Sequence, residues 1–279
     1  MGQKIIQEFG KNIMGNKIDL NFGLFWSGAP LSYLRYLTFK TLRHFHPHSR
    51  IQLYIANKYK KDGFKWLREK QEFERPELIE EDYINRLTEL DVELIHFDFC
   101  NDYQPNFQSD FFRWWYLKNF GGFYLDNDQI ILKSFETLPL NYDLIYSEYN
   151  ISTMVYAPVG VIGATKGCKV VDHISKTIQQ FYDPNNYNSI GPFMFKTVIN
   201  SKDWKNCINV PFRYFYPIRE SDRIVRAYDG SFELTNKSYA IHWYGGHPIS
   251  QEFNRNYTEE FAKTSNDTIS RKLREFKLV

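Results

Sequence analysis

The stretch GGFYLDNDQIILKSFETLP, residues 121–139, decides the predicted fold, because it places charged side chains directly after a short apolar run. Phe123–Leu125 is an aromatic and aliphatic run typical of a buried strand. Asp126, Asn127 and Asp128 follow where that strand would leave the sheet. In open α/β sheets ligands bind outside the carboxyl ends of the strands, so these side chains are candidates for a binding site.

Asp126 and Asp128 define the chemistry expected at this strand end. Two carboxylates so close in sequence repel each other unless a cation, an arginine or a proton lies between them. A hard divalent ion such as Mn²⁺ or Mg²⁺ would relieve the repulsion and leave coordination positions for phosphate oxygens. The Asp-x-Asp pattern alone is also typical of an ordinary polar turn. A calcium EF-hand loop is a poor match, because Ile131 stands where that loop requires glycine.

The surrounding segments alternate between strand-like and helix-like patterns. Phe22–Gly28 reads as a buried strand, residues 31–47 as a helix ended by Pro47, and Ile51–Ala56 as the next strand. Such a β-α-β unit predicts the α/β class, with a Rossmann-like mixed central sheet flanked by helices. Further strands are expected at 92–99, 123–125, 143–149 and 159–165, and helices at 109–120 and 170–181, the first begun by Ser109 or nearby polar residues.

The length of 279 residues suits a single domain, 1–279. A charged stretch at about 58–91 is expected to form a helical insertion, and a short basic helix is expected at about 266–279. The net charge of +2 does not indicate a nucleic-acid partner, since nucleic-acid binders usually show a concentrated basic face. Aromatic residues make up 18% of the chain, which supplies rings for stacking on flat or sugar-like ligands.

Several patterns bear on where the protein acts. The cysteines, Cys100, Cys168 and Cys207, are far apart and odd in number, which favours reduced thiols over a disulfide framework. The first residues show no secretory apolar segment, and the longest weakly polar run is shorter than the roughly 20 residues that cross a bilayer. We therefore expect action in the cytoplasm. The basic tail is expected either to touch an anionic membrane surface peripherally or to form a solvated helix.

Residues 109–139, SDFFRWWYLKNFGGFYLDNDQIILKSFETLP, carry a longer pattern. Ser-Asp, two residues and Arg open a helix, and a Gly-Gly pair, an aromatic and aliphatic run and Asp-x-Asp follow. This pattern resembles the sugar-binding region of glycosyltransferases with an Asp-x-Asp motif. That family includes initiating mannosyltransferases, bacterial capsular polysaccharide transferases and, more distantly, the clostridial glucosylating toxins. The resemblance implies an A-type glycosyltransferase fold.

The resemblance also implies a donor site. Asp110 and Arg113 share one helix face and would hold the donor sugar, whereas by themselves they would read as a surface ion pair. Asp128 would hold the metal, and Asp126 would assist through water or ribose contacts. Asn127 is placed beside the nucleotide sugar as a spacer that points away from the metal. Further implied donor contacts are Trp26 on the nucleotide base, Ser27 beside it, and Tyr124 on a phosphate or the ribose.

Two later segments extend the implied site. NSIGPFMF, residues 188–195, looks like the family's Thr-Gly-Pro segment near the sugar and acceptor, although Ile190 replaces the threonine. YAIHWYGGHP, residues 239–248, looks like the family's closing turn, where His242 is expected to complete the metal site and His247 is its competitor. The remaining candidates are Gly191, Trp243, Gly246 and His247 for the donor, and Glu148 and Asn150 near the anomeric carbon.

Together these patterns predict a metal-dependent glycosyltransferase that moves a sugar from a UDP- or GDP-sugar to an acceptor hydroxyl. Retention of the anomeric configuration is implied by the resemblance alone. The acceptor would be a glycan, a lipid-linked sugar or a protein, in a bacterial or viral setting. The alternative is a non-catalytic module of the same fold that binds nucleotide sugars or glycans. The sequence leaves the base, the sugar, the acceptor and the oligomeric state open.

Overall fold

The computed structural model describes residues 17–58, 78–151, 154–218 and 223–279. Its centre is a large mixed sheet with strand order β3-β2-β1-β4-β8-β6-β7, in which β9 pairs with β6. β3, β2, β1 and β4 run parallel, whereas β8 runs antiparallel to both β4 and β6. The strands are β1 (Phe22–Trp26), β2 (Ile51–Ala56), β3 (Val92–Phe97), β4 (Gly122–Leu125), β6 (Leu144–Ile151), β7 (Met154–Tyr156), β8 (Val161–Ala164) and β9 (Cys207–Pro211).

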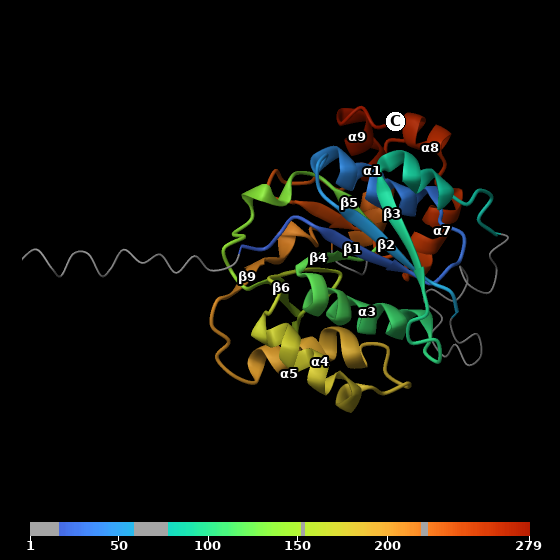
Figure 1. Cartoon of the computed structure of the whole chain (residues 1–279). Helices are drawn as coiled ribbons and strands as arrows, with labels where there is room; N and C mark the ends of the chain where they lie inside the picture. Colours follow the sequence, from blue (N-terminus) through green and yellow to red (C-terminus); the bar gives the residue numbers. More distant parts are fainter. Residues whose placement is uncertain (1–16, 59–77, 152–153, 219–222) are drawn as a thin grey trace, which may run out of the picture.

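Helices cover both faces of this sheet (Figure 1). On one face lie α1 and the C-terminal helices, and on the other lie α3, α4 and α5. The predicted α/β class, with a mixed central sheet flanked by helices, is thereby confirmed. The helices are α1 (Tyr33–Phe45), α3 (Pro105–Phe120), α4 (Lys169–Phe181), α5 (Met194–Asn200), α6 (Arg223–Tyr228), α7 (Pro248–Asn256), α8 (Glu259–Thr264) and α9 (Thr268–Glu275).

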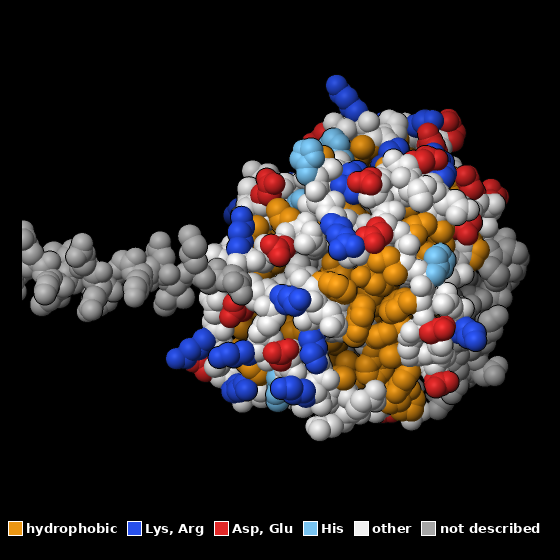
Figure 2. All heavy atoms as spheres, in the orientation of Figure 1, with side chains coloured by type: hydrophobic (Ala, Val, Ile, Leu, Met, Phe, Trp, Pro, Cys, Tyr) orange, Lys and Arg blue, Asp and Glu red, His pale blue; other side chains and the backbone are white. Residues whose placement is uncertain are grey.

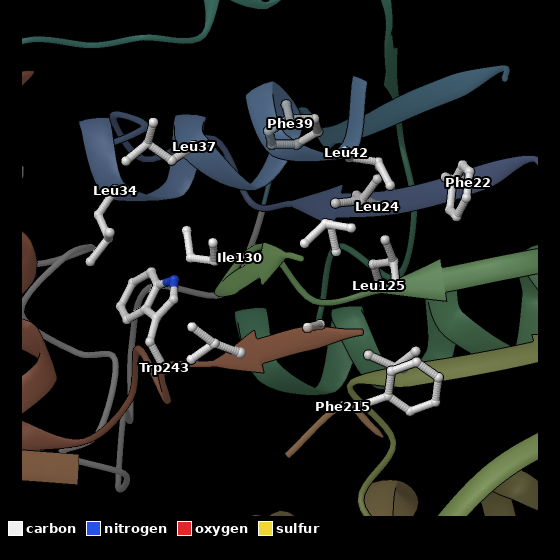
Figure 3. Close-up of a cluster of buried hydrophobic side chains, with 14 of the residues drawn as sticks. Phe22, Leu24, Leu34, Leu37, Phe39, Leu42, Leu125, Ile130, Phe215 and Trp243 are labelled. Atoms are coloured by element: carbon white, nitrogen blue, oxygen red, sulfur yellow. The ribbon is translucent and has the colours of Figure 1, made fainter. Parts of the chain in front are cut away.

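The side chains of β1 show why the sheet is covered on both faces. Leu24 packs into the apolar cluster on the α1 side, and its neighbour Phe25 packs into the cluster on the α3 side. Successive strand residues point to opposite faces, so a strand that is apolar at every position needs a helical layer on each side. Figure 3 shows part of the α1-side cluster, where Leu42 of α1 lies near Leu24 and Leu125 of the sheet.

The helix that carries the Ser-Asp-x-x-Arg pattern is one turn longer than predicted. α3 begins at Pro105, not at Ser109, because proline is well suited to the first helical position, where its missing N–H is not needed. The helix ends at Gly121, which has a φ of +69°. A Cβ at Gly122 would lie 2.5 Å from the Asn21 carbonyl oxygen, so the Gly-Gly pair allows the helix to turn directly into β4.

The structure describes only part of the expected helical insertion but all of the expected C-terminal helical segment. Residues 59–77 of the expected helical insertion lie outside the described residues, and residues 78–91 contain the short 3₁₀-helix η2 (Asn85–Leu90). The segment of the expected C-terminal helix contains α9, where the Asp267 side chain caps the first turn by accepting hydrogen bonds from two backbone N–H groups. Among the described residues, no helix is long and apolar enough to cross a membrane.

A second, two-stranded sheet lies next to the Asp-x-Asp motif. β5 (Gln129–Ile131) pairs antiparallel with β10 (Ala240–His242), and His242 stands opposite Gln129. The backbone N–H of Trp243 donates to the backbone carbonyl oxygen of Asp128 at 2.9 Å, which extends the strand pairing by one residue. The small sheet therefore fixes a histidine from the C-terminal third beside a motif more than a hundred residues earlier in the chain.

Charged side chains of both signs are spread over the outer surface of the molecule (Figure 2). On the face shown in Figure 2, acidic and basic side chains are interspersed around a strip of apolar side chains. The charged groups that matter for the chemistry described below are buried or half-buried at the carboxyl ends of β1 and β4 instead.

Candidate active site

A cavity of about 490 Å³ opens at the carboxyl ends of β1 and β4. This is the edge of the sheet where ligands of open α/β folds collect, and the volume lies within the usual range for small-molecule sites. The structure brings most of the predicted site residues together in its walls: Trp26, Ser27, Asp110, Arg113, Tyr124, Asp126, Asn127, Asp128, His242, Gly246 and His247.

Three side chains form a candidate metal site in the cavity. One ligand atom each from Asp126, Asp128 and His242 lie within 4.8 Å of one another. The His242 Nε2 is 2.9 Å from Asp128 Oδ1 and 3.9 Å from Asp126 Oδ2. Neighbouring ligands of an octahedral ion such as Mg²⁺ or Mn²⁺ lie about 3 Å apart when each bond is about 2.1 Å. The spacing and the oxygen and imidazole donors therefore fit a divalent cation.

The Asp126 carboxylate is oriented from the α3 side. Its Oδ1 accepts a hydrogen bond from the Tyr124 hydroxyl at 2.6 Å and another from Arg113 Nη2 at 3.2 Å. The Tyr124 oxygen lies 2.8 Å from the Ser109 hydroxyl, which then donates to it. Because these contacts use Oδ1, the other oxygen, Oδ2, faces His242 and is available to a cation.

The Asp128 carboxylate is oriented from the opposite side of the site. Its Oδ2 accepts a hydrogen bond from the Gly245 backbone N–H at 2.8 Å, and its Oδ1 faces His242. Burial alone would raise the pKa of Asp128, but His242, the Arg35 guanidinium and the Gly245 N–H together hold that pKa at about 2. Asp128 is therefore ionised throughout the physiological range.

Asp110 and Arg113 form a buried ion pair, not the exposed helix-surface pair that the spacing alone would suggest. Arg113 Nη1 donates to Asp110 Oδ1, and the two residues are 3% and 7% exposed. Burial raises the pKa of Asp110 to about 6, although Arg113 favours the ionised form. A Cβ at Gly191 would lie 3.0 Å from Asp110 Oδ1, so the predicted glycine leaves the carboxylate its space.

Trp26 lies at the cavity wall but is only 6% exposed. Its indole N–H donates to the Ala29 carbonyl oxygen, and the Arg35 guanidinium lies 4.6 Å above its ring. Arg35 also lines the cavity and lies 5.3 Å from the centre of the Trp243 ring. The neighbouring Ser27 hydroxyl donates to Gln108 Oε1 at 3.3 Å.

Three predicted site residues are placed differently from expectation. Trp243 is fully buried in the α1-side core and does not line the cavity, so its predicted contact with the donor is wrong (Figure 3). Glu148 and Asn150 of β6 are not among the described residues that line the cavity, whereas Tyr149 between them is. Side chains alternate along a strand, and Glu148 accepts a hydrogen bond from Asn209 at 2.9 Å instead.

Asn127 and His247 have structural partners. The Asn127 side-chain N–H donates to the Phe25 carbonyl oxygen at 2.7 Å, which ties the loop between the aspartates to β1. His247 caps α7, with Nδ1 accepting from the Ile249 N–H at 3.3 Å. Both residues border the cavity, but the three-residue ligand cluster contains His242 and not His247.

Two glycines that lie against side chains of the site, Gly160 and Gly245, were not among the predicted site residues. A Cβ at Gly160 would lie 2.6 Å from Asp126 Oδ2 and 3.4 Å from His242 Nε2, and a Cβ at Gly245 would lie 2.8 Å from Arg35 Nη2. Gly160 is in a weakly polar run and carries no motif that would single it out. Its requirement follows from the approach of three separate segments, which only the structure displays.

The cavity at the strand ends thus combines two aspartates and a histidine with a buried Asp–Arg pair. Residues 37–145 match the family described as "glycosyltransferase sugar-binding region containing DXD motif". The match confirms the predicted resemblance and indicates a glycosyltransferase. It contains Asp110, Arg113, Asp126 and Asp128, but it ends before β10 and His242.

Several solved structures are similar to the chain. The PaToxG glycosyltransferase is 20% identical over 67% of this chain and 70% of its own, with a TM-score of 0.46. GlyE of Streptococcus pneumoniae TIGR4 is 13% identical over 94% of this chain and 61% of its own, with a TM-score of 0.49. The galactosyltransferase LgtC with donor and acceptor sugar analogs is 12% identical over 86% and 98%, with a TM-score of 0.40. No curated protein matches the chain.

Proposed function

We propose that the protein transfers a sugar from a nucleoside diphosphate sugar, a UDP- or GDP-sugar, to an acceptor hydroxyl on a glycan, with a divalent cation such as Mn²⁺. The observation that carries this proposal is the meeting of Asp126, Asp128 and His242 in one cavity with the buried Asp110–Arg113 pair. The match of residues 37–145 to a sugar-binding region supports it.

Each part of the cavity has a role in this proposal. A divalent cation held by Asp126, Asp128 and His242 would offset the negative charge that develops on the departing diphosphate. Asp110 would accept hydrogen bonds from hydroxyls of the donor sugar, and Arg113 would hold Asp110 and Asp126 in place.

The nucleoside end would lie toward β1 and α1. There Arg35 borders the cavity, and its guanidinium lies against the rings of Trp26 and Trp243. Trp26 itself is largely covered, so we assign the contact with the base to the Trp26–Arg35 pair together.

In the proposed reaction the acceptor oxygen forms a bond to the anomeric carbon of the donor sugar. The bond from that carbon to the diphosphate oxygen breaks, and its electron pair leaves with the nucleoside diphosphate. The acceptor hydroxyl proton passes to the departing diphosphate. Reaction on the face from which the diphosphate leaves would retain the anomeric configuration, in line with the resemblance.

The test measures binding and turnover separately. Calorimetry would follow the binding of UDP- and GDP-sugars with Mn²⁺ and with EDTA, and a second assay would measure the release of nucleoside diphosphate. We expect Mn²⁺-dependent binding of one donor class followed by release. Binding without release, with or without added saccharides, would identify a non-catalytic binding module, and equal binding in EDTA would contradict the metal assignment.

A further inference from the structure

The cavity is divided into a charged half and an uncharged half. Among the described lining residues, the side chains that carry a carboxylate, guanidinium or imidazole come from α1, α3, the Asp-x-Asp motif, β10 and the segment that follows β10. Another part of the wall comes from residues 149–159 and 185–192, and its described lining residues are amides, tyrosines, prolines and one valine. Gly160 lies between this part and the charged half, beside Asp126. A diphosphate with its cation suits only the charged half.

The uncharged half carries a concentration of amides. One segment lines it with three asparagines and a tyrosine: Asn185, Asn186, Tyr187 and Asn188. Asn106, on the first turn of α3, also lines the cavity. An amide offers both hydrogen-bond donors and acceptors without charge, as does a sugar hydroxyl. Two further rings, Tyr149 and Tyr156 with centroids 5.4 Å apart, complete this wall.

The amides are held next to the proposed donor sugar. Asn106 stands four residues before Asp110, so the two share one face of α3. Gly191 stands three residues after Asn188. A Cβ at Gly191 would lie only 3.0 Å from Asp110 Oδ1. The segment that carries the amides therefore borders the Asp110 carboxylate. The Asn106 Nδ2 is buried and finds no hydrogen-bond partner in the described part of the chain.

We propose that this wall, through Asn106, Asn188 and the two tyrosines, binds the acceptor, and that the acceptor is a neutral saccharide. The inference rests on the proposed function, because it places the acceptor against the donor sugar that Asp110 would hold. An acceptor with a phosphate or carboxylate group beside the reacting sugar would find no cationic partner among the described residues of this wall. A neutral ring instead finds amides for its hydroxyls and aromatic rings for its apolar face.

The test uses neutral disaccharides as probes: lactose, cellobiose, maltose and mannobiose. Saturation-transfer NMR would measure their binding to the full chain in the presence of Mn²⁺ and the UDP or GDP that binds. We expect at least one probe to bind, and Asn188→Ala and Asn106→Ala each to weaken it at least fivefold. Asn119→Ala is the matched control, because Asn119 is an exposed asparagine at the other end of α3.

The possible results distinguish the proposed acceptor site from its alternatives. Absence of binding by all four neutral probes, or binding that both variants leave unchanged, would overturn the proposal. A loss of UDP or GDP affinity in Asn188→Ala, at an unchanged melting temperature, would overturn it by assigning the amide to the donor. If no nucleotide binds the wild-type protein while a disaccharide does, the donor chemistry fails but the saccharide site stands.

Discussion

The two carboxylates of the Asp-x-Asp motif are only two residues apart, yet they are held by different parts of the chain. Asp126 is oriented by Tyr124 and Arg113, both within thirteen residues of it in sequence. Asp128 is oriented by Gly245 and faces His242, both more than a hundred residues later. One half of the candidate metal site is thus a local motif, and the other half is created by the pairing of β5 with β10.

Because the two carboxylates are held differently, we expect mutations on the two sides of the site to have different effects. The Asp126 side depends on a buried ion pair and a short chain of hydroxyls, so its failure should affect folding as well as binding. The Asp128 side depends on a small two-stranded sheet that brings His242 into place, so its failure should affect metal binding first. Four predictions test this contrast.

Replacing Asp128 with alanine should have the largest effect. It removes one ligand carboxylate, and we expect Mn²⁺-dependent release of nucleoside diphosphate to fall by about 10³-fold. Enzyme assays with added Mn²⁺, together with Mn²⁺ titration by electron paramagnetic resonance, would measure it. Asn127→Ala is the control beside it, since Asn127 bonds to the Phe25 carbonyl and not to a ligand atom. Normal activity of Asp128→Ala would contradict the metal site.

Replacing Arg113 with methionine should mainly destabilise the fold. The change leaves the Asp110 and Asp126 carboxylates without their buried counter-ion. Breaking a buried ion pair by removing one partner typically costs about 3–5 kcal/mol, so urea unfolding should show a loss of that order. Arg50→Met serves as the control, because the Arg50–Glu93 pair is exposed. Equal stability losses in the two variants would break the contrast between the regions.

Replacing Tyr124 with phenylalanine isolates the hydroxyl that orients Asp126. The ring stays in the core, and the change removes the hydroxyl with its hydrogen bonds to Asp126, Ser109 and Arg113. Partners that orient a ligand usually affect metal affinity by about 10–100-fold, so Mn²⁺ should bind more weakly by about tenfold. The melting temperature without metal should change little. If Mn²⁺ affinity is unchanged while donor affinity falls, Tyr124 contacts the donor directly, as the sequence analysis expected.

The smallest effect concerns pH. Asp110 has a pKa of about 6 and Asp128 a pKa of about 2, so lowering the pH from 7 to 5 protonates Asp110 and leaves Asp128 ionised. At a pH one unit below its pKa, an acid is about nine-tenths protonated. Because the ionised Asp110 would bind the donor, donor affinity should fall by up to about tenfold at pH 5. Calorimetry of Asp110→Asn over the same range is the control, and it should show a shallower decline. Parallel pH profiles would exclude Asp110 as the titrating group.

Much of the Asp126 half could be predicted, because its parts are neighbours in sequence. Ser109, Asp110 and Arg113 lie on α3, Tyr124 lies on β4, and Asp126 follows that strand directly. Helical spacing places Asp110 and Arg113 on one face. The burial of the Asp110–Arg113 pair could not be predicted, since the same spacing is typical of exposed ion pairs. It follows from the packing of α3 between the sheet and the segment around Gly191.

The alternation of strands and helices and the position of the Asp-x-Asp motif at a strand end could be predicted from the sequence alone. These features depend on side-chain periodicity and on residues near each other in the chain. Only the tertiary structure decided that His242 faces Asp128, that Trp243 lies in the core, that Glu148 faces Asn209, and that Gly160 leaves room beside the ligand atoms. Those facts arise from contacts between distant segments, whose register is set by strand pairing and packing.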